Sequence, residues 1–200
     1  MKKLFIGIIL LTGTLLLQAQ VRRTPVQRTP VQQRTTAQAS QSAYKGSLGH
    51  YELRGPVQSC KEIGDSWEVI RTFDRNGVLS TIDGESVHTS PRTYEFSANG
   101  RILRFFPIPG VEHRYLKYEY DKMGRLVKTS DYDETYTKEV ITYSYNAEGH
   151  QVKTSFVAYG PHGGEGTSNC KVLEKDSYGN WTKRSWGGSS IERREITYYE

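Results

Sequence analysis

Short alternations of apolar and polar residues dominate the chain from Gly49 to its C-terminus. Runs such as Trp67–Phe73 and Lys117–Tyr120 are rich in aromatic and β-branched residues, and Gly, Asp and Asn separate one run from the next. No window of a dozen residues in this part has a helical period. The pattern is typical of short strands joined by tight turns, and it predicts an all-β domain over residues 49–200.

The strand-and-turn pattern repeats along the chain. In each copy a polar triplet precedes a glycine. The five copies, each starting one residue before the triplet, are Phe73–Gly77, Phe96–Gly100, Tyr120–Gly124, Tyr145–Gly149 and Lys175–Gly179. Their glycines are 23, 24, 25 and 30 residues apart. An alternating strand precedes each copy and another follows it, and Glu195–Tyr199 repeats the first strand of a sixth unit. The chain is therefore built from hairpin repeats.

The residues of each turn have a physical reason. A side-chain oxygen in the triplet can accept a hydrogen bond from a backbone N–H, and the glycine can adopt the left-handed conformation. This combination predicts a hairpin built on a type I turn with a glycine bulge. The expected turn residues are Asp74, Gly77, Gly100, Asp121, Gly124, Asn146, Gly149, Asp176 and Gly179. The predicted fold is an antiparallel meander of about 11–12 strands in a strongly twisted or partly closed sheet.

The segment Tyr118–Leu126, Tyr-x-Tyr-Asp-x-x-Gly-Arg-Leu, resembles the YD repeat of the Rhs and teneurin families. The resemblance covers roughly residues 67–200, although Asn146, Gln151 and Lys175 depart from the repeat. It implies a long antiparallel sheet of the kind that coils into a hollow shell, for which five units are few. The MORN repeat has a similar period but needs further glycines, which are missing here. The resemblance implies a shape and no activity.

The first 48 residues differ in composition from the rest. Lys2 and Lys3 precede the apolar run Leu4–Leu17, which predicts a signal peptide over residues 1–19, with a short membrane anchor as the alternative. Residues 20–48 are a basic segment rich in Gln, Thr and Pro, and we expect a disordered linker. Beyond Leu48 the chain has 20 basic and 22 acidic residues, which argues against a nucleic-acid-binding domain. We expect an exported protein, periplasmic or extracellular, without stable membrane insertion after signal cleavage.

Cys60 and Cys170 are the only cysteines. In an exported chain they suggest one disulfide, with two separate thiols as the alternative. In a flat meander roughly eight strands at ~4.8 Å would place them near 40 Å apart, whereas a disulfide needs Cα atoms within about 7 Å. Either the sheet curls until its ends meet, or the disulfide does not form.

Sequence motifs for catalysis are missing. No histidine lies at zinc-ligand spacing, and no nucleophile motif such as Gly-x-Ser-x-Gly occurs. We therefore predict no catalytic residues, no metal site and no cofactor. Asp131, Asp133 and Glu134 could hold calcium weakly, with a solvated acidic loop as the alternative. The glycine-rich Gly160–Gly166 could be a functional loop or a long hairpin connection.

Aromatic side chains at equivalent repeat positions are the main functional candidates. They form a candidate binding surface of Tyr94, Phe96, Tyr118, Tyr120, Tyr143 and Tyr145. Within each pair the two rings share one face of a strand, so they either form an exposed ladder or pack in the core.

The sequence favours an exported, non-catalytic repeat module that binds or scaffolds at the cell envelope or outside the cell. The alternatives are carbohydrate binding through the tyrosine ladder and a small exported enzyme. The partner would be a protein or glycan at the cell surface. An exposed edge at Glu195–Tyr199 could also pair with a partner strand or a second copy of the chain.

Overall fold

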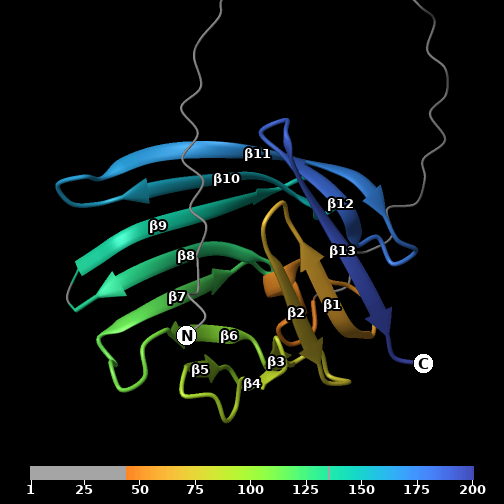
Figure 1. The fold of residues 1–200 in the computed structure, drawn as a ribbon, viewed down its shortest axis with the longest axis horizontal. Coiled ribbons are helices and arrows are strands. Elements are labelled where there is room, and N and C mark those ends of the chain that lie inside the picture. Colours follow the sequence, from red (N-terminus) through yellow and green to blue (C-terminus); the bar gives the residue numbers. More distant parts are fainter. Residues whose placement is uncertain (1–43, 135) are drawn as a thin grey trace, which may run out of the picture. The chain divides into compact units, whose positions relative to one another are not determined.

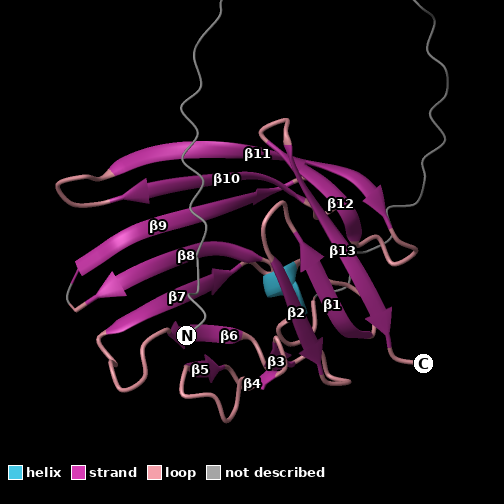
Figure 2. Cartoon of the chain, viewed as in Figure 1, coloured by secondary structure: helices cyan, strands magenta, loops and turns pink. Residues whose placement is uncertain are grey.

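The computed structural model describes residues 44–134 and 136–200, all of which belong to one unit over residues 40–200. The predicted signal peptide and most of the predicted linker lie outside the described residues. The described part has one short 3-10 helix, η1 (Leu48–Tyr51), and thirteen strands (Figures 1 and 2). The strands are β1 (Val57–Ile63), β2 (Glu68–Phe73), β3 (Leu79–Ile82), β4 (Glu85–Ser86), β5 (Thr93–Phe96), β6 (Ile102–Phe106), β7 (Arg114–Tyr120), β8 (Leu126–Asp133), β9 (Tyr136–Tyr145), β10 (Gln151–Ala158), β11 (Gly164–Lys175), β12 (Trp181–Trp186) and β13 (Ser190–Tyr198).

All thirteen strands form one antiparallel sheet in the order β4-β3-β2-β1-β13-β12-β11-β10-β9-β8-β7-β6-β5. The predicted all-β meander is confirmed. Strands β4 and β5 lie at opposite ends of this order, yet only residues 87–92 join them, and they lie close together in Figure 1. A flat sheet of this size would place its end strands almost 60 Å apart at ~4.8 Å per strand. The sheet therefore curls back on itself and leaves an open seam between β4 and β5.

Strand β11 joins the two halves of the curled sheet. Its first half pairs with β10, as at Ser168 with Thr154, and its second half pairs with β12, as at Lys171 with Ser185. In Figure 2 the strands on either side of β11 run in different directions. The concave face of the sheet is thus formed by two walls that meet at β11.

The repeated turns have the same geometry in all five units. The glycines have φ between 76° and 85°, the left-handed region that disfavours other residues. In unit 3, taken as Lys117–Lys128, Asp121 Oδ1 accepts hydrogen bonds from the backbone N–H groups of Met123 and Arg125, both at 2.9 Å. Asp74, Ser97, Asn146 and Asp176 have the equivalent role in the other units.

The residue two positions after each turn glycine points into the core. These residues are Leu79, Ile102, Leu126, Gln151 and Trp181, and all five are buried. Leu79 and Ile102 belong to the core cluster that also contains Leu53, Val57 and Phe73. The repeat thus supplies one buried residue per hairpin. Full burial of one such apolar side chain contributes about 2 kcal/mol to the free energy of unfolding.

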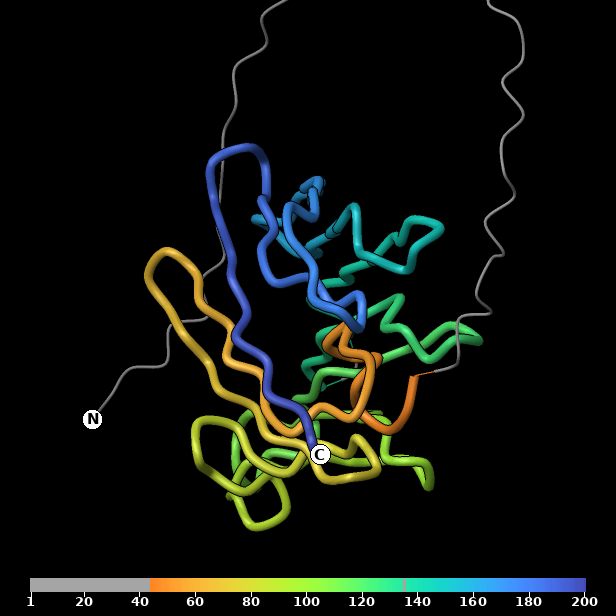
Figure 3. Tube along the Cα trace, turned by 90° about the vertical axis from the view of Figure 1, so that its right-hand side faces the viewer, coloured from red at the N-terminus to blue at the C-terminus, as the bar shows by residue number. Residues whose placement is uncertain are grey.

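Residues 44–54, which we call the inner segment, dock on the turns of all five units (Figure 3). Each of the first four turns accepts at least one hydrogen bond from this segment, and in the fifth unit the acceptor is Asn180, directly after the turn. The pairs are Ser47 N to Gly77 O (2.8 Å), Ser47 Oγ to Gly100 O (2.6 Å), Tyr44 N to Met123 O (2.9 Å), Arg54 Nη2 to Glu148 O, and Arg54 N to Asn180 Oδ1 (2.6 Å). Residues 44–48, predicted as linker, therefore belong to the folded unit.

The inner segment and the third turn approach each other so closely that position 49 must be glycine. A Cβ there would lie 1.9 Å from the carbonyl oxygen of Gly124, so only glycine allows this approach. The inner segment thus packs directly on the backbone of the third turn.

One expectation about the sheet is wrong. Cys60 and Cys170 are buried free thiols and do not form the candidate disulfide. Strands β13 and β12 lie between β1 and β11, which separates the two thiols by roughly 14 Å of sheet width. The sheet does curl, but the strands that meet do not carry the cysteines. The expected edge at Glu195–Tyr199 is paired on one side: β13 pairs with β1 over Arg193–Tyr198, whereas its pairing with β12 covers only Ser190–Arg193.

Candidate functional site

A cavity of about 200 Å³ lies on the concave side of the sheet, against the inner segment. Three parts of the chain line it: the inner segment, the wall of β8, β9 and β10, and the wall of β1, β12 and β13. The lining residues are His50, Tyr51, Glu52, Leu126, Tyr143, Tyr145, Gln151, Glu62, Arg184 and Arg194. The cavity therefore combines aromatic rings with charged and neutral polar groups, as ligand sites commonly do.

The repeat departs from its own pattern where the cavity lies. The first three units place Leu79, Ile102 and Leu126 after the turn, whereas the fourth places Gln151 there. The backbone N–H of Gln151 donates to Glu52 Oε1 at 2.7 Å, and its side chain donates to Thr154. A polar group has replaced an apolar one at a core position, so this part of the core cannot close in the same way.

Glu52 connects the inner segment to the fourth and fifth units. It follows η1 in the left-handed conformation, with φ 55°, and its carboxylate is buried. Besides the bond from Gln151, Oε2 accepts hydrogen bonds from Arg184 Nη1 at 2.8 Å and Trp181 Nε1 at 3.3 Å. Every carboxylate oxygen of Glu52 is therefore bonded to the protein.

A second buried carboxylate, Glu62, is held by two arginines. Arg194 donates to Oε1 through Nε at 2.8 Å and through Nη2, and Arg71 Nη1 donates to Oε2 at 2.7 Å. Burial alone would raise the pKa of Glu62, but Arg194 and Arg71 outweigh it and hold this pKa far below its usual range. Glu62 is thus ionised and saturated with hydrogen bonds.

The arginines of this network are packed on a tryptophan. The guanidinium carbons of Arg184 and Arg194 lie 3.9 and 3.7 Å from the Trp181 ring centroid. Arg184 also pairs with Glu192 at 2.6 Å. Together with Arg71, the network contains three arginines and three glutamates, so it is balanced in charge.

Two arginine nitrogens in the cavity wall have no acceptor within residues 44–134 and 136–200. Arg194 Nη1 is buried and lacks a hydrogen-bond partner among the described residues. Arg184 donates through Nε and Nη1, and its Nη2 makes no hydrogen bond to the described part of the chain. A buried donor without a partner costs free energy, so Arg194 Nη1 would be stabilised by a ligand or a water molecule.

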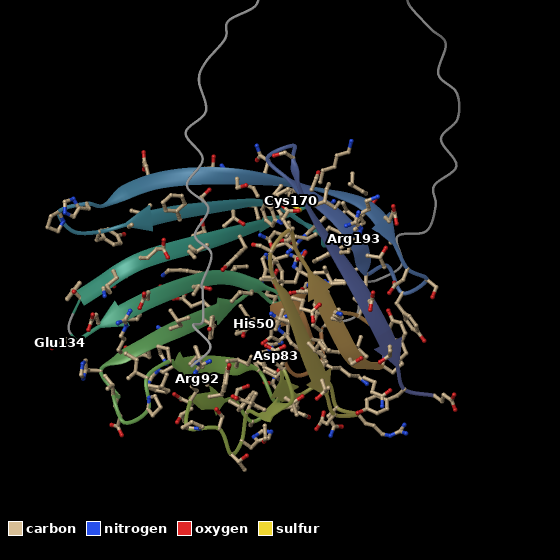
Figure 4. All side chains as sticks on the ribbon, viewed as in Figure 1. His50, Asp83, Arg92, Glu134, Cys170 and Arg193 are labelled. Atoms are coloured by element: carbon tan, nitrogen blue, oxygen red, sulfur yellow. The ribbon has the colours of Figure 1, made fainter. Side chains whose placement is uncertain are left out.

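His50 lies against the end of β7, where Figure 4 labels it. Its ring packs edge-on against Tyr118 with centroids 4.6 Å apart, and Nδ1 lies 2.9 Å from the Tyr120 hydroxyl. Burial, with a contribution from Arg71, lowers the pKa of His50 to about 3. His50 is therefore neutral at physiological pH.

The hydrogen bonds of Tyr120 determine the tautomer of His50. The Tyr120 hydroxyl has one proton, which it donates to the carbonyl oxygen of Ile102 at 2.7 Å. The contact with His50 must then have Nδ1–H as the donor and the hydroxyl oxygen as the acceptor. Nε2 is therefore unprotonated, and it has no hydrogen-bond partner among the described residues.

The six predicted ladder residues face inward and are half-buried. Tyr94, Phe96 and Tyr118 pack against the core, and burial raises the pKa of Tyr118 well above its usual value. Tyr120 and Tyr145 occupy equivalent places, since Tyr145 donates to the Leu126 carbonyl as Tyr120 donates to that of Ile102. Only Tyr143 and Tyr145 line the cavity. The structure does not form an exposed six-ring platform.

The remaining candidates lie elsewhere. Burial raises the pKa of Cys60 and of Cys170 to about 11, which makes both thiols poor nucleophiles. Asp133 pairs with Lys138 at 2.9 Å. Within residues 44–134 and 136–200, no group of three or more His, Cys, Asp or Glu side chains is placed to hold a metal ion. None of the described residues forms a helix of the length and apolarity needed to cross a bilayer.

Sequence reasoning missed most of the cavity. His50 and Glu52 precede the first repeat, and Glu62, Arg184 and Arg194 sit in strands whose alternation also fits a solvent-exposed face. The signal that could have located the cavity is Gln151, which breaks the repeat at a core position.

Comparisons with protein families and with curated proteins found no match. No protein-family model matches the chain, and no curated protein matches it.

Proposed function

We propose that this protein is an exported, non-catalytic binding module that holds a small ligand in the concave cavity. The observation that carries the proposal is the polar cavity itself, which lies where the repeat is broken and whose lining residue Arg194 has a buried donor without an acceptor among the described residues. The signal peptide predicted for residues 1–19 supports export, and the YD-like turns support a repeat-built scaffold.

The ionisation of the cavity residues supports binding over catalysis. A general base works best when its pKa lies near the working pH, whereas burial lowers that of His50 to about 3. Glu52 and Glu62 are occupied by hydrogen bonds and ion pairs. The cavity is thus rigid and preorganised, and its groups are suited to orienting a ligand.

A ligand screen with two variants tests the proposal. Gln151→Leu restores the residue type of the first three units and fills the cavity with apolar atoms, while the backbone bond to Glu52 remains. Thr142→Leu, on an exposed position of β9, is the matched control. We expect compounds that raise the melting temperature of the wild type and of Thr142→Leu to have no effect on Gln151→Leu. Equal shifts in all three proteins would place the ligand outside the cavity and contradict the proposal.

Carbohydrate binding is the second candidate, because Tyr143 and Tyr145 line the same cavity. Stacking of a sugar on these rings would make binding sensitive to Tyr143→Ala. It would be insensitive to Tyr136→Ala, since Tyr136 is exposed on the same strand. A glycan array probed with both variants checks this reading, and an array without any Tyr143-dependent signal rules it out.

A further inference from the structure

The hydrogen-bonding groups that remain available in the cavity define a ligand class. The carboxylates of Glu52 and Glu62 already accept bonds at every oxygen, so they have little capacity left for a ligand donor. What remains is a donor side, made by Arg194 Nη1 and Arg184 Nη2, and an acceptor side, made by His50 Nε2 and the Gln151 side-chain oxygen. The residues that carry these groups belong to β13, β12, the inner segment and β10, and all of them line the same cavity.

The donor side requires an acceptor on the ligand. Arg194 is buried, with a side chain only 2% exposed, and its Nη1 has no partner in the described part of the chain. A ligand oxygen would satisfy this N–H and recover the free energy lost on its burial.

The acceptor side requires a donor on the ligand. Because the Tyr120 hydroxyl donates its proton to Ile102, His50 donates through Nδ1–H and has a lone pair at Nε2. Nε2 can therefore accept a hydrogen bond from a ligand donor, but it cannot bond to a ligand group that is itself only an acceptor. A carboxylate ligand would leave Nε2 unsatisfied.

The charge balance argues in the same direction. Arg71, Arg184 and Arg194 are matched by Glu52, Glu62 and Glu192. An anion in the cavity would add an unbalanced charge beside the buried carboxylates of Glu52 and Glu62, and a cation would add one beside Arg184 and Arg194. A neutral ligand leaves the balance unchanged.

We propose, resting on the proposed function, that the cavity binds a neutral molecule through an amide group. The amide carbonyl accepts from Arg194 or Arg184, and the amide N–H donates to His50 Nε2. The planar group and the rest of the ligand pack against Tyr143 and Tyr145. At about 30 Å³ per water the cavity has room for roughly seven waters, which is the size of one small residue or sugar substituent. An acetamido sugar and a peptide end both carry this chemistry.

The test uses benzamide and benzoate, which share a shape and differ in charge and in the N–H donor. Dissociation constants for the folded protein are measured by NMR titration, together with the ¹⁵N shift of His50 Nε2. We expect benzamide to bind about tenfold tighter than benzoate. Benzamide should also move the Nε2 resonance, and its binding should be lost in Gln151→Leu. Benzoate binding as tightly as benzamide would overturn the proposal.

Three further probes separate the sources of the amide. N-acetylglucosamine and N-acetyl-alaninamide carry it on a sugar and on a peptide unit, and glucose lacks it. Binding of either amide, at least tenfold above glucose, supports the proposal and names the source. If glucose binds as well as the amides, the amide assignment fails while a cavity-binding function stands. If none of the five probes binds, the amide assignment also fails, and the broader screen with Gln151→Leu decides the proposed function separately.

Discussion

Units 3 and 4 of the repeat, Lys117–Lys128 and Ile141–Lys153, are neighbours that meet the inner segment in different ways. In unit 3, Asp121 pairs with Arg125 at 2.6 Å and Leu126 fills the core, so the hairpin satisfies its own groups. In unit 4 Asn146 and Gln151 replace the acid and the leucine, and Glu52 from the inner segment completes the hydrogen bonds. A repeat that follows its pattern packs locally, and one that departs from it needs a distant partner and leaves a cavity.

The prediction with the largest expected effect on stability concerns how the inner segment packs on unit 3. Gly49→Ala would place a Cβ 1.9 Å from the Gly124 carbonyl oxygen, and backbone must move to relieve that contact. We expect a loss of roughly 3 kcal/mol in the free energy of unfolding, measured by urea denaturation. Gly187→Ala is the control, because its Cβ would meet open space and only its positive φ costs about 1 kcal/mol. Similar midpoints for the two variants would contradict the docking of the inner segment on the third turn.

The next test uses the buried histidine between the inner segment and unit 3. The folded-state pKa of His50 is about 3, below the ordinary value of 6.5, so the unfolded chain binds a proton that the folded protein excludes. Stability from this group is present above pH 6.5 and falls as the pH drops toward 3. Between pH 6.5 and pH 5 the loss is roughly 2 kcal/mol.

His50→Gln should remove that loss, because glutamine keeps a donor and an acceptor but does not titrate. His162→Gln, in an exposed loop, should behave like the wild type. The measurement is the urea midpoint at pH 7 and at pH 5. A His50→Gln variant with the same pH dependence as the wild type would show that His50 is not held neutral.

The strands and turns could be predicted from the sequence because their causes are local. Asp121 and Gly124 act within one turn, and the strands alternate with period two, so short windows contain the information. The cavity could not be predicted, because Glu62 meets Arg194 across 132 residues and Glu52 meets Arg184 across the same separation. The first pair depends on β13 returning to β1, and the second on the inner segment reaching β12, and a simple meander suggests neither. The same closure explains why the disulfide expectation was wrong.

A smaller test converts unit 4 into the pattern of unit 3. Gln151→Leu buries an apolar side chain beside Leu126 and loses one hydrogen bond to Thr154. The burial exceeds the lost bond, so we expect a gain of about 0.5–1 kcal/mol in the free energy of unfolding. The reverse change, Leu126→Gln, should cost roughly 2 kcal/mol because unit 3 has no distant partner for the amide. A loss of stability in Gln151→Leu would mean that the polar residue stabilises the fold and that the cavity is only a structural feature.

The smallest expected effect compares the two turn residues directly. Burial raises the pKa of Asp121, but hydrogen bonds from Arg125 and the Arg125 charge outweigh it and lower this pKa below the ordinary 3.8. The ionised form therefore stabilises the fold above pH 3.8, and this contribution disappears as the pH falls through the lower folded-state pKa.

Asp121→Asn should cost about 0.5 kcal/mol at pH 7 and close to nothing at pH 2.5. Asn146→Asp is the matched change in unit 4, where His150 stands in place of the arginine, so we expect no comparable gain. Urea midpoints of the two variants at both pH values decide the matter, and an Asp121→Asn cost that is equal at pH 7 and pH 2.5 would show that the turn needs only a side-chain oxygen and no charge.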